Sequence, residues 1–267
     1  MKKLAVLDLY NGQANQGMRC IQEIVAAFAG QIEYDVFDVR SKAEIPGLEY
    51  DIYLSTGGPG DPRVGDGVWD EKYYNWLQSV WEWNQHHEDK KKVFFICHSF
   101  QMAVHHFKLA TINKRQSMSF GTFPVHKTEQ GMKEAVFNGL ETPFWAADFR
   151  DFQVIKPRLA LFEKMGAEIL ALEKIRPHID LERAIMAIRF SKEMIGVQFH
   201  PEADPQGMIA HFIDPERRKA IIDEHGAEKY HRMLVDLRHP DRIMRTYERV
   251  LPQFLEEAIG VEEAVFA

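Results

Sequence analysis

The sequence predicts an α/β fold: a doubly wound, mostly parallel sheet, followed by a strand-rich extension and a helical C-terminal appendage. Short apolar runs alternate with helical patterns over residues 4–107, an order that favours a parallel sheet with helices on both faces. Strand-like runs dominate residues 119–199, and helical patterns dominate beyond Pro205. We therefore expect a core domain over residues 1–205 and a helical extension over residues 206–267, which packs on the core or on a partner.

The first half of the chain supplies the alternating elements. Its opening apolar run is interrupted by Asp8, too early for a signal peptide, so a buried strand fits better. The helical pattern after Glu71 carries an aromatic stripe that includes Tyr73 and Trp76, which we interpret as core packing. Strands are expected over residues 4–9, 32–39, 51–55 and 93–96, and helices over residues 16–28, 71–87 and 99–107.

The second half changes from strands to helices. Asp214 and Pro215 are typical of a helix start, Gly226 of a helix end, and Pro240 opens a long amphipathic helix. Strands are expected over residues 120–125, 144–154, 168–172, 184–190 and 194–199, with a short helix over residues 158–165.

Composition excludes several classes of protein. The net charge of −7 argues against a nucleic-acid partner, and the basic run Lys90–Lys92 is better explained as a solvated turn. The two cysteines, Cys20 and Cys97, exclude a disulfide scaffold and favour a reducing, cytoplasmic location. Apolar runs are too short for a membrane span, so no membrane partner is expected.

Three segments at predicted strand ends carry the chemistry. Cys97 stands where an apolar strand turns directly into a helix, and His200 and Glu202 stand at the end of another strand. Because strand side chains alternate, His200 and Glu202 project to the same side, where the carboxylate can orient the imidazole toward a nucleophile. The Gly-rich loop over residues 55–62 also follows a strand. In a parallel sheet these ends share one crevice, with Cys97 as the candidate nucleophile.

The order of these motifs resembles the class I glutamine amidotransferases, including the stand-alone subunits similar to the amidotransferase of GMP synthetase. The resemblance covers roughly residues 1–205, and the stretch Gln198–Glu202 is its most specific part. It implies a flavodoxin-like sheet with antiparallel pairing in the extension. It also implies cleavage of the γ-amide of glutamine, or of a γ-glutamyl compound, through a γ-glutamyl thioester on Cys97 with release of ammonia.

The same resemblance assigns roles to further residues. The backbone amides of Gly58 and His98 would form the oxyanion hole, and Gly57 and Gln101 would contact the substrate. Arg150 lies in the segment that corresponds to a substrate-contacting turn of the family. It would either pair with the substrate α-carboxylate or be a solvated arginine without a role, and the sequence leaves both alternatives open.

Two residues depart from the elbow pattern of the family. Small residues are favoured two positions before and after an elbow nucleophile, whereas this chain has Phe95 and Ser99 there. Phe95 could displace the elbow or fill part of the pocket. These departures, together with Phe149, favour the competing interpretation: a catalytically silent relative that binds a small ligand or a partner.

No cofactor and no metal site is expected. The pairs His86–His87 and His105–His106 are adjacent on helices and point about 100° apart, so neither pair forms a ligand face. The expected small-molecule partner is glutamine or a γ-glutamyl compound. Residues 206–267 are too few to bind and activate an ammonia acceptor, which suggests a separate synthase subunit. The sequence does not identify the acceptor, and it leaves open whether the chain forms a homodimer.

Overall fold

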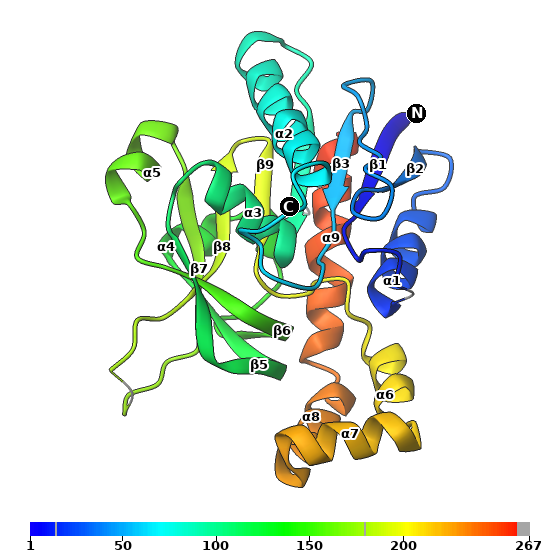
Figure 1. The fold of residues 1–267 in the computed structure, drawn as a ribbon, viewed down its shortest axis with the longest axis vertical. Coiled ribbons are helices and arrows are strands. Elements are labelled where there is room, and N and C mark those ends of the chain that lie inside the picture. The colour runs from blue at the N-terminus through cyan, green and yellow to red at the C-terminus, as the bar shows by residue number, and fades with distance from the viewer. Residues whose placement is uncertain (14, 179, 261–267) are drawn as a thin grey trace, which may run out of the picture.

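The computed structural model describes residues 1–13, 15–178 and 180–260, which form one mixed sheet with helices on both faces (Figure 1). The strand order is β2-β1-β3-β4-β9-β8-β7-β5-β6 in a nine-stranded sheet. The strands are β1 Lys2–Asp8, β2 Ile32–Asp38, β3 Ile52–Ser55, β4 Lys92–Ile96, β5 Thr111–Lys127, β6 Phe144–Ile155, β7 Glu168–Glu173, β8 Ile185–Ser191 and β9 Met194–Val197.

The pairing confirms the predicted fold class. Strands β2, β1, β3, β4 and β9 pair in parallel, and β9, β8, β7, β5 and β6 continue the sheet by antiparallel pairing. The helices are α1 Gln16–Ala26, α2 Trp69–His86, α3 His98–His106, α4 Glu129–Lys133, α5 Leu159–Met165, α6 Pro205–Ile213, α7 Pro215–His225, α8 Ala227–Arg238 and α9 Ile243–Ile259, with a short 3-10 helix, η1, at Ala135–Phe137.

Strand β4 shows how the two faces of the sheet are filled. All of its apolar residues are buried, and successive side chains point to opposite faces. Phe94 and Ile96 belong to the apolar cluster that contains α1 and α9. Val93 and Phe95 belong to the cluster that contains α2 and α3. The continuous apolar run of β4 is therefore that of a strand covered by helices on both sides.

The C-terminal helices pack in two places. Helix α9 buries Val250 and Phe254 in the same cluster as β1 and α1. Helices α6 and α8 instead pack Met208, Phe212 and Met233 against the β5–β6 hairpin. Figure 1 shows α6, α7 and α8 gathered at one end of the molecule beside that hairpin, while α9 runs back along the sheet.

Strand β5 differs from the sequence-based expectation. It begins at Thr111, whereas the pattern predicted a strand only from residue 120. Its pairing with β6 shifts register between Lys114 and Ser119, within a polar, largely exposed stretch. Side-chain alternation is lost across such an irregularity, so the first part of the strand carries no period-two signal. Among the described residues, no helix is both long and apolar enough to span a bilayer.

Candidate active site

The carboxyl ends of β3, β4 and β9 bring the three sequence motifs together. Cys97 follows β4 directly and adopts φ 49° and ψ −96°, an unusual backbone conformation for a residue with a side chain. Its N–H donates to the Val197 carbonyl at 2.8 Å, and its own carbonyl accepts from the Gln101 N–H at 3.1 Å. Neighbouring backbone thus holds the strained turn that places the sulfur at the start of α3.

Both departures from the elbow pattern are accommodated without displacing the elbow. Ser99 Oγ accepts from the Ile96 N–H at 2.9 Å and donates to the Ser55 carbonyl at 2.7 Å, so it ties β3 to the turn. Phe95 packs away from the cavity, with its ring centroid 5.7 Å from that of Phe190. A Cβ added to Gly196 on β9 would lie 3.1 Å from the Phe95 Cβ, so the glycine makes room for this side chain. The predicted filling of the pocket by Phe95 is therefore wrong.

His200 and Glu202 are directly connected. Nδ1 of His200 lies 2.8 Å from Oε1 of the buried Glu202, and the Tyr10 hydroxyl donates to the same oxygen at 3.4 Å. Burial opposes protonation of the imidazole, but the negative charge of Glu202 and the interaction with Cys97 outweigh it and raise the pKa of His200 well above its ordinary value. These interactions favour a protonated imidazole beside the Glu202 carboxylate.

The Gly-rich loop approaches this group closely. A Cβ added to Gly57 would lie 2.9 Å from Cε1 of His200 and 3.6 Å from the Cys97 Cβ. A Cβ added to Gly58 would lie 2.4 Å from the Leu9 carbonyl oxygen, so this position excludes any side chain. His98 opens α3, and the first N–H groups of a helix lack acceptors within the helix. The imidazole of His98 is buried, which lowers its pKa to about 3 and keeps it neutral.

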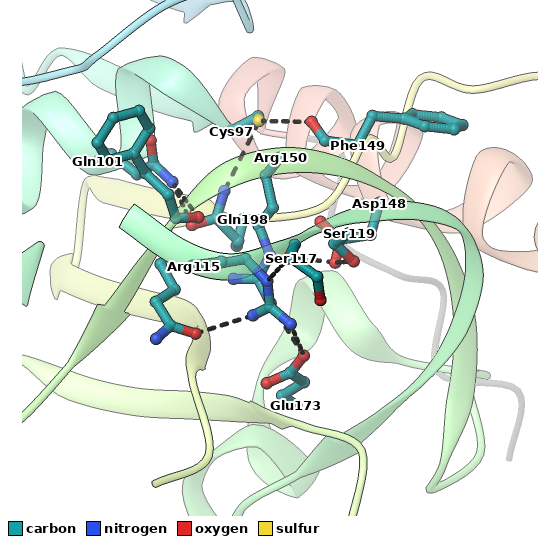
Figure 2. A network of polar contacts seen from close by, with 12 residues as sticks. Cys97, Gln101, Arg115, Ser117, Ser119, Asp148, Phe149, Arg150, Glu173 and Gln198 are labelled. Carbon is teal, nitrogen blue, oxygen red and sulfur yellow. Dashed lines mark hydrogen bonds and ion pairs between the residues drawn. The ribbon is translucent and has the colours of Figure 1, made fainter. Parts of the chain in front are cut away.

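A buried relay of two amides reaches the Cys97 sulfur (Figure 2). Nε2 of Gln101 donates to the Phe152 carbonyl at 3.1 Å and to Oε1 of Gln198 at 2.8 Å, and Nε2 of Gln198 points at Sγ of Cys97 at 3.6 Å. A backbone carbonyl can only accept, so the nitrogen of Gln101 must face Phe152 and Gln198 must turn its oxygen toward Gln101. The sulfur of Cys97 therefore receives an N–H donor.

None of the three predicted substrate-binding residues lines the cavity: Gly57 lies beside His200, and the other two are engaged elsewhere. Gln101 is buried and engaged in the relay. Arg150 is also buried, and its guanidinium pairs with Asp148 at 3.1 Å and with Glu173 at 3.3 Å (Figure 2). Because side chains alternate along β6, Phe149 faces the cavity and Arg150 points to the other side of the strand. Neither alternative that the sequence left open for Arg150 applies, since it is a buried ion-pair residue.

Cys97, Gly58, His200 and Glu202 line a cavity of about 430 Å³. One side of the cavity is polar and comes from the β1–α1 region, including Tyr10. The other side is apolar and comes from β5, β6 and α6; we call it the aromatic wall, formed by Met118, Phe120, Phe149, Met208 and Phe212.

Sequence reasoning missed two kinds of residue at this site. Tyr10 stands just after β1, so the rule that ligands bind at strand ends could have identified it. Apart from Phe149, which the sequence already singled out, the aromatic wall had no such signal, because its members come from three elements that meet only in the folded chain.

Comparisons with known proteins give one family match, one distant curated relative and several solved structures of similar fold. The sequence profile described as glutamine amidotransferase class-I matches residues 15–216. A curated relative, homoserine O-acetyltransferase from Catenibacterium mitsuokai, is 25% identical over 179 residues, which are 66% of this chain and 52% of that protein. The chain thus spans about half the length of this curated relative.

Solved structures share the fold at low identity. A glutamine amidotransferase from Thermotoga maritima superposes with a TM-score of 0.72 at 14% identity, covering 97% of this chain and 98% of that one. One from Methylobacillus flagellatus gives 0.67 at 14% identity, covering 96% and 95%. The glutaminase domain of Trypanosoma brucei CTPS, solved with bound acivicin, gives 0.55 at 16% identity, covering 76% and 86%.

Proposed function

Because the chain belongs to the class I glutamine amidotransferase family, we propose that it hydrolyses the γ-amide of glutamine or of a γ-glutamyl compound. The observation that carries the proposal is the hydrogen-bonded pair of His200 and Glu202 beside the strained Cys97, all lining one cavity. This is the arrangement of a nucleophile, a base and an orienting carboxylate.

Attack on the amide begins with the Cys97 sulfur. The raised pKa of His200 favours a thiolate–imidazolium pair, and the thiolate is the nucleophilic form. It adds to the amide carbonyl, and the oxygen that becomes negative is stabilised by the N–H groups of Gly58 and His98. Each donor of this kind typically lowers the barrier by about 3 kcal/mol.

Collapse of the tetrahedral intermediate breaks the C–N bond. His200 gives its proton to the departing nitrogen, so the product leaves as ammonia or an amine. Water, deprotonated by the same imidazole, then cleaves the thioester on Cys97, releases the acid and restores the thiol. Glu202 holds the imidazole in one orientation throughout, through the 2.8 Å contact to Nδ1. Released ammonia would serve a separate synthase subunit, and a reducing compartment such as the cytoplasm would keep Cys97 as a thiol.

Acivicin, the ligand of the CTPS glutaminase domain, tests the proposal. We expect incubation to add one inhibitor mass at Cys97 and to abolish ammonia release from glutamine, measured by peptide mapping and a coupled ammonia assay. Cys97→Ser should take no label at this position and release no ammonia, with an unchanged melting temperature. Folded protein that neither takes the label nor releases ammonia or an amine would instead support a silent, ligand-binding relative.

A further inference from the structure

The aromatic wall is a preformed surface next to the proposed nucleophile. The ring centroid of Phe149 lies 5.1 Å from that of Phe120 and 6.2 Å from that of Phe212. Phe120 is additionally held by His225, whose ring stacks on it at 4.3 Å with an interplanar angle of 19°. Packing on both sides fixes these rings before any ligand arrives, which reduces the entropy cost of binding against them.

The side chains that form the wall are uncharged, although Lys229 Nζ, which is not part of the lining, lies 5.8 Å from the ring centroid of Phe120. His211 lines the same part of the cavity, but burial and the neighbouring Arg217 lower its pKa below the ordinary value, so it is neutral near pH 7. On the opposite side, Arg19 is engaged by the carboxylates of Glu23 and Asp204. Within the described lining, the wall therefore offers apolar contacts and no charge for an ion.

The aromatic wall lies next to His200, on the side of the scissile bond that carries the departing nitrogen. The ring centroid of Phe149 lies 6.0 Å from that of His200. His200 must protonate the departing nitrogen, so that nitrogen lies beside the imidazole when the bond breaks. A group attached to the nitrogen then lies against Phe149, whereas ammonia as the leaving group would leave the wall without a contact.

We propose that the preferred substrate is a γ-glutamyl amide whose nitrogen carries an apolar group about the size of an aromatic ring. The inference rests on the proposed function and specifies its leaving group. Cys97 forms a bond to the γ-carbonyl carbon, the C–N bond breaks, and His200 supplies the proton with which a primary amine departs. Water then hydrolyses the thioester, so one amide and one water give one carboxylic acid and one amine.

Two synthetic substrates test this inference: γ-glutamyl phenethylamide and γ-glutamyl methylamide, with amine release measured by mass spectrometry. We expect kcat/KM for the phenethylamide to exceed that for the methylamide at least tenfold, the order of magnitude that extra apolar contact in a pocket supplies. Phe149→Ala should bring the ratio of the two values close to one, and Phe212→Leu should lower it in the same direction. Phe162→Ala, which truncates a buried ring outside the cavity, should leave the ratio unchanged.

The ratio separates binding from catalysis, since damage to the triad lowers both values together. A ratio of one or less in the unaltered protein, or a high ratio that neither aromatic variant changes, overturns the inference. If acivicin labels Cys97 and glutamine is hydrolysed, either result leaves the proposed function intact. If Cys97 takes no label and none of glutamine and the two amides is cleaved, the proposed function and this inference fall together.

Discussion

Replacement of Gln198 by methionine removes one hydrogen-bond donor from the Cys97 sulfur and nearly preserves side-chain volume. Gln198 is completely buried, and its Nε2 lies 3.6 Å from Sγ. An N–H donor stabilises the thiolate more than the thiol, because the thiolate is a charged acceptor. We therefore expect the variant to hold the thiolate less well.

The size of this effect follows from the geometry. Hydrogen bonds to charged groups contribute about 1.5–3 kcal/mol. The sulfur is a weak acceptor at a long distance, so the lower end of that range applies, and about 1.4 kcal/mol corresponds to a factor of ten in rate. The rate of Cys97 alkylation at pH 7 should thus fall about tenfold in Gln198→Met. Gln101→Leu should shift it in the same direction, because it releases the orientation of the Gln198 amide.

The assay is the rate of iodoacetamide alkylation at the Cys97 peptide, measured at pH 7 by mass spectrometry. Peptide mapping separates this thiol from Cys20, whose pKa burial raises to about 11. Asn84→Ala is the matched control, because Asn84 is a buried amide with two hydrogen bonds to Lys91. It should destabilise the fold without changing the alkylation rate at Cys97. An unchanged rate in folded Gln198→Met would refute the role assigned to the relay.

Two further substitutions test the site and its support. Gly57→Ala places a Cβ about 2.9 Å from the His200 ring, so the imidazole must move. We expect kcat for glutamine hydrolysis to fall about 100-fold with little change in melting temperature. An unaffected kcat would contradict this placement of His200. Glu173→Gln leaves Arg150 and Arg115 without their shared carboxylate and should cost about 3–5 kcal/mol of unfolding free energy in denaturant titrations. Burial would raise the pKa of Glu173, but the surrounding arginines outweigh burial and lower this pKa. The ionised Glu173 therefore stabilises the fold fully above the ordinary carboxyl pKa. This stabilisation is lost as the pH falls through the lower pKa of the folded state. The variant should lack that acid-side loss, and an equal loss in both proteins would refute the linkage.

The strand-end rule was sufficient to predict which motifs meet. Cys97, His200 and the Gly-rich loop are far apart in the chain, yet each follows a parallel strand of the same sheet. A parallel sheet aligns its carboxyl ends at one edge, so the convergence follows from element order alone. His200 and Glu202 are in contact at 2.8 Å as expected, but not through strand alternation: β9 ends at Val197, His200 forms an isolated bridge with Ala147, and Glu202 lies in the turn that follows.

The same reasoning failed where the result depended on a second element. The local sequence allows Phe95 to displace the elbow or to fill part of the pocket, but Gly196 on the neighbouring strand β9 leaves room for the rings of Phe100 and Phe190 and for Phe95. Volume complementarity between two strands is a property of the pair, and neither local sequence contains it. For Arg150 the sequence leaves open pairing with the substrate or a solvated position without a role, and neither holds, because the alternation along β6 directs Phe149, and not Arg150, into the cavity.

The aromatic wall explains why a motif-based description of this site is incomplete. Its rings and thioethers come from β5, β6 and α6, and the last of these lies in the stretch assigned from sequence to a separate extension. Met208 and Phe212 face the cavity because α6 packs on the hairpin that also carries Phe120 and Phe149. If the proposed function holds, cleavage chemistry would reside at the strand ends, whereas the group accepted on the leaving nitrogen would depend on a helix added after the last strand. Relatives that share the strand-end motifs but differ in this helical segment would then cleave the same bond in differently substituted amides.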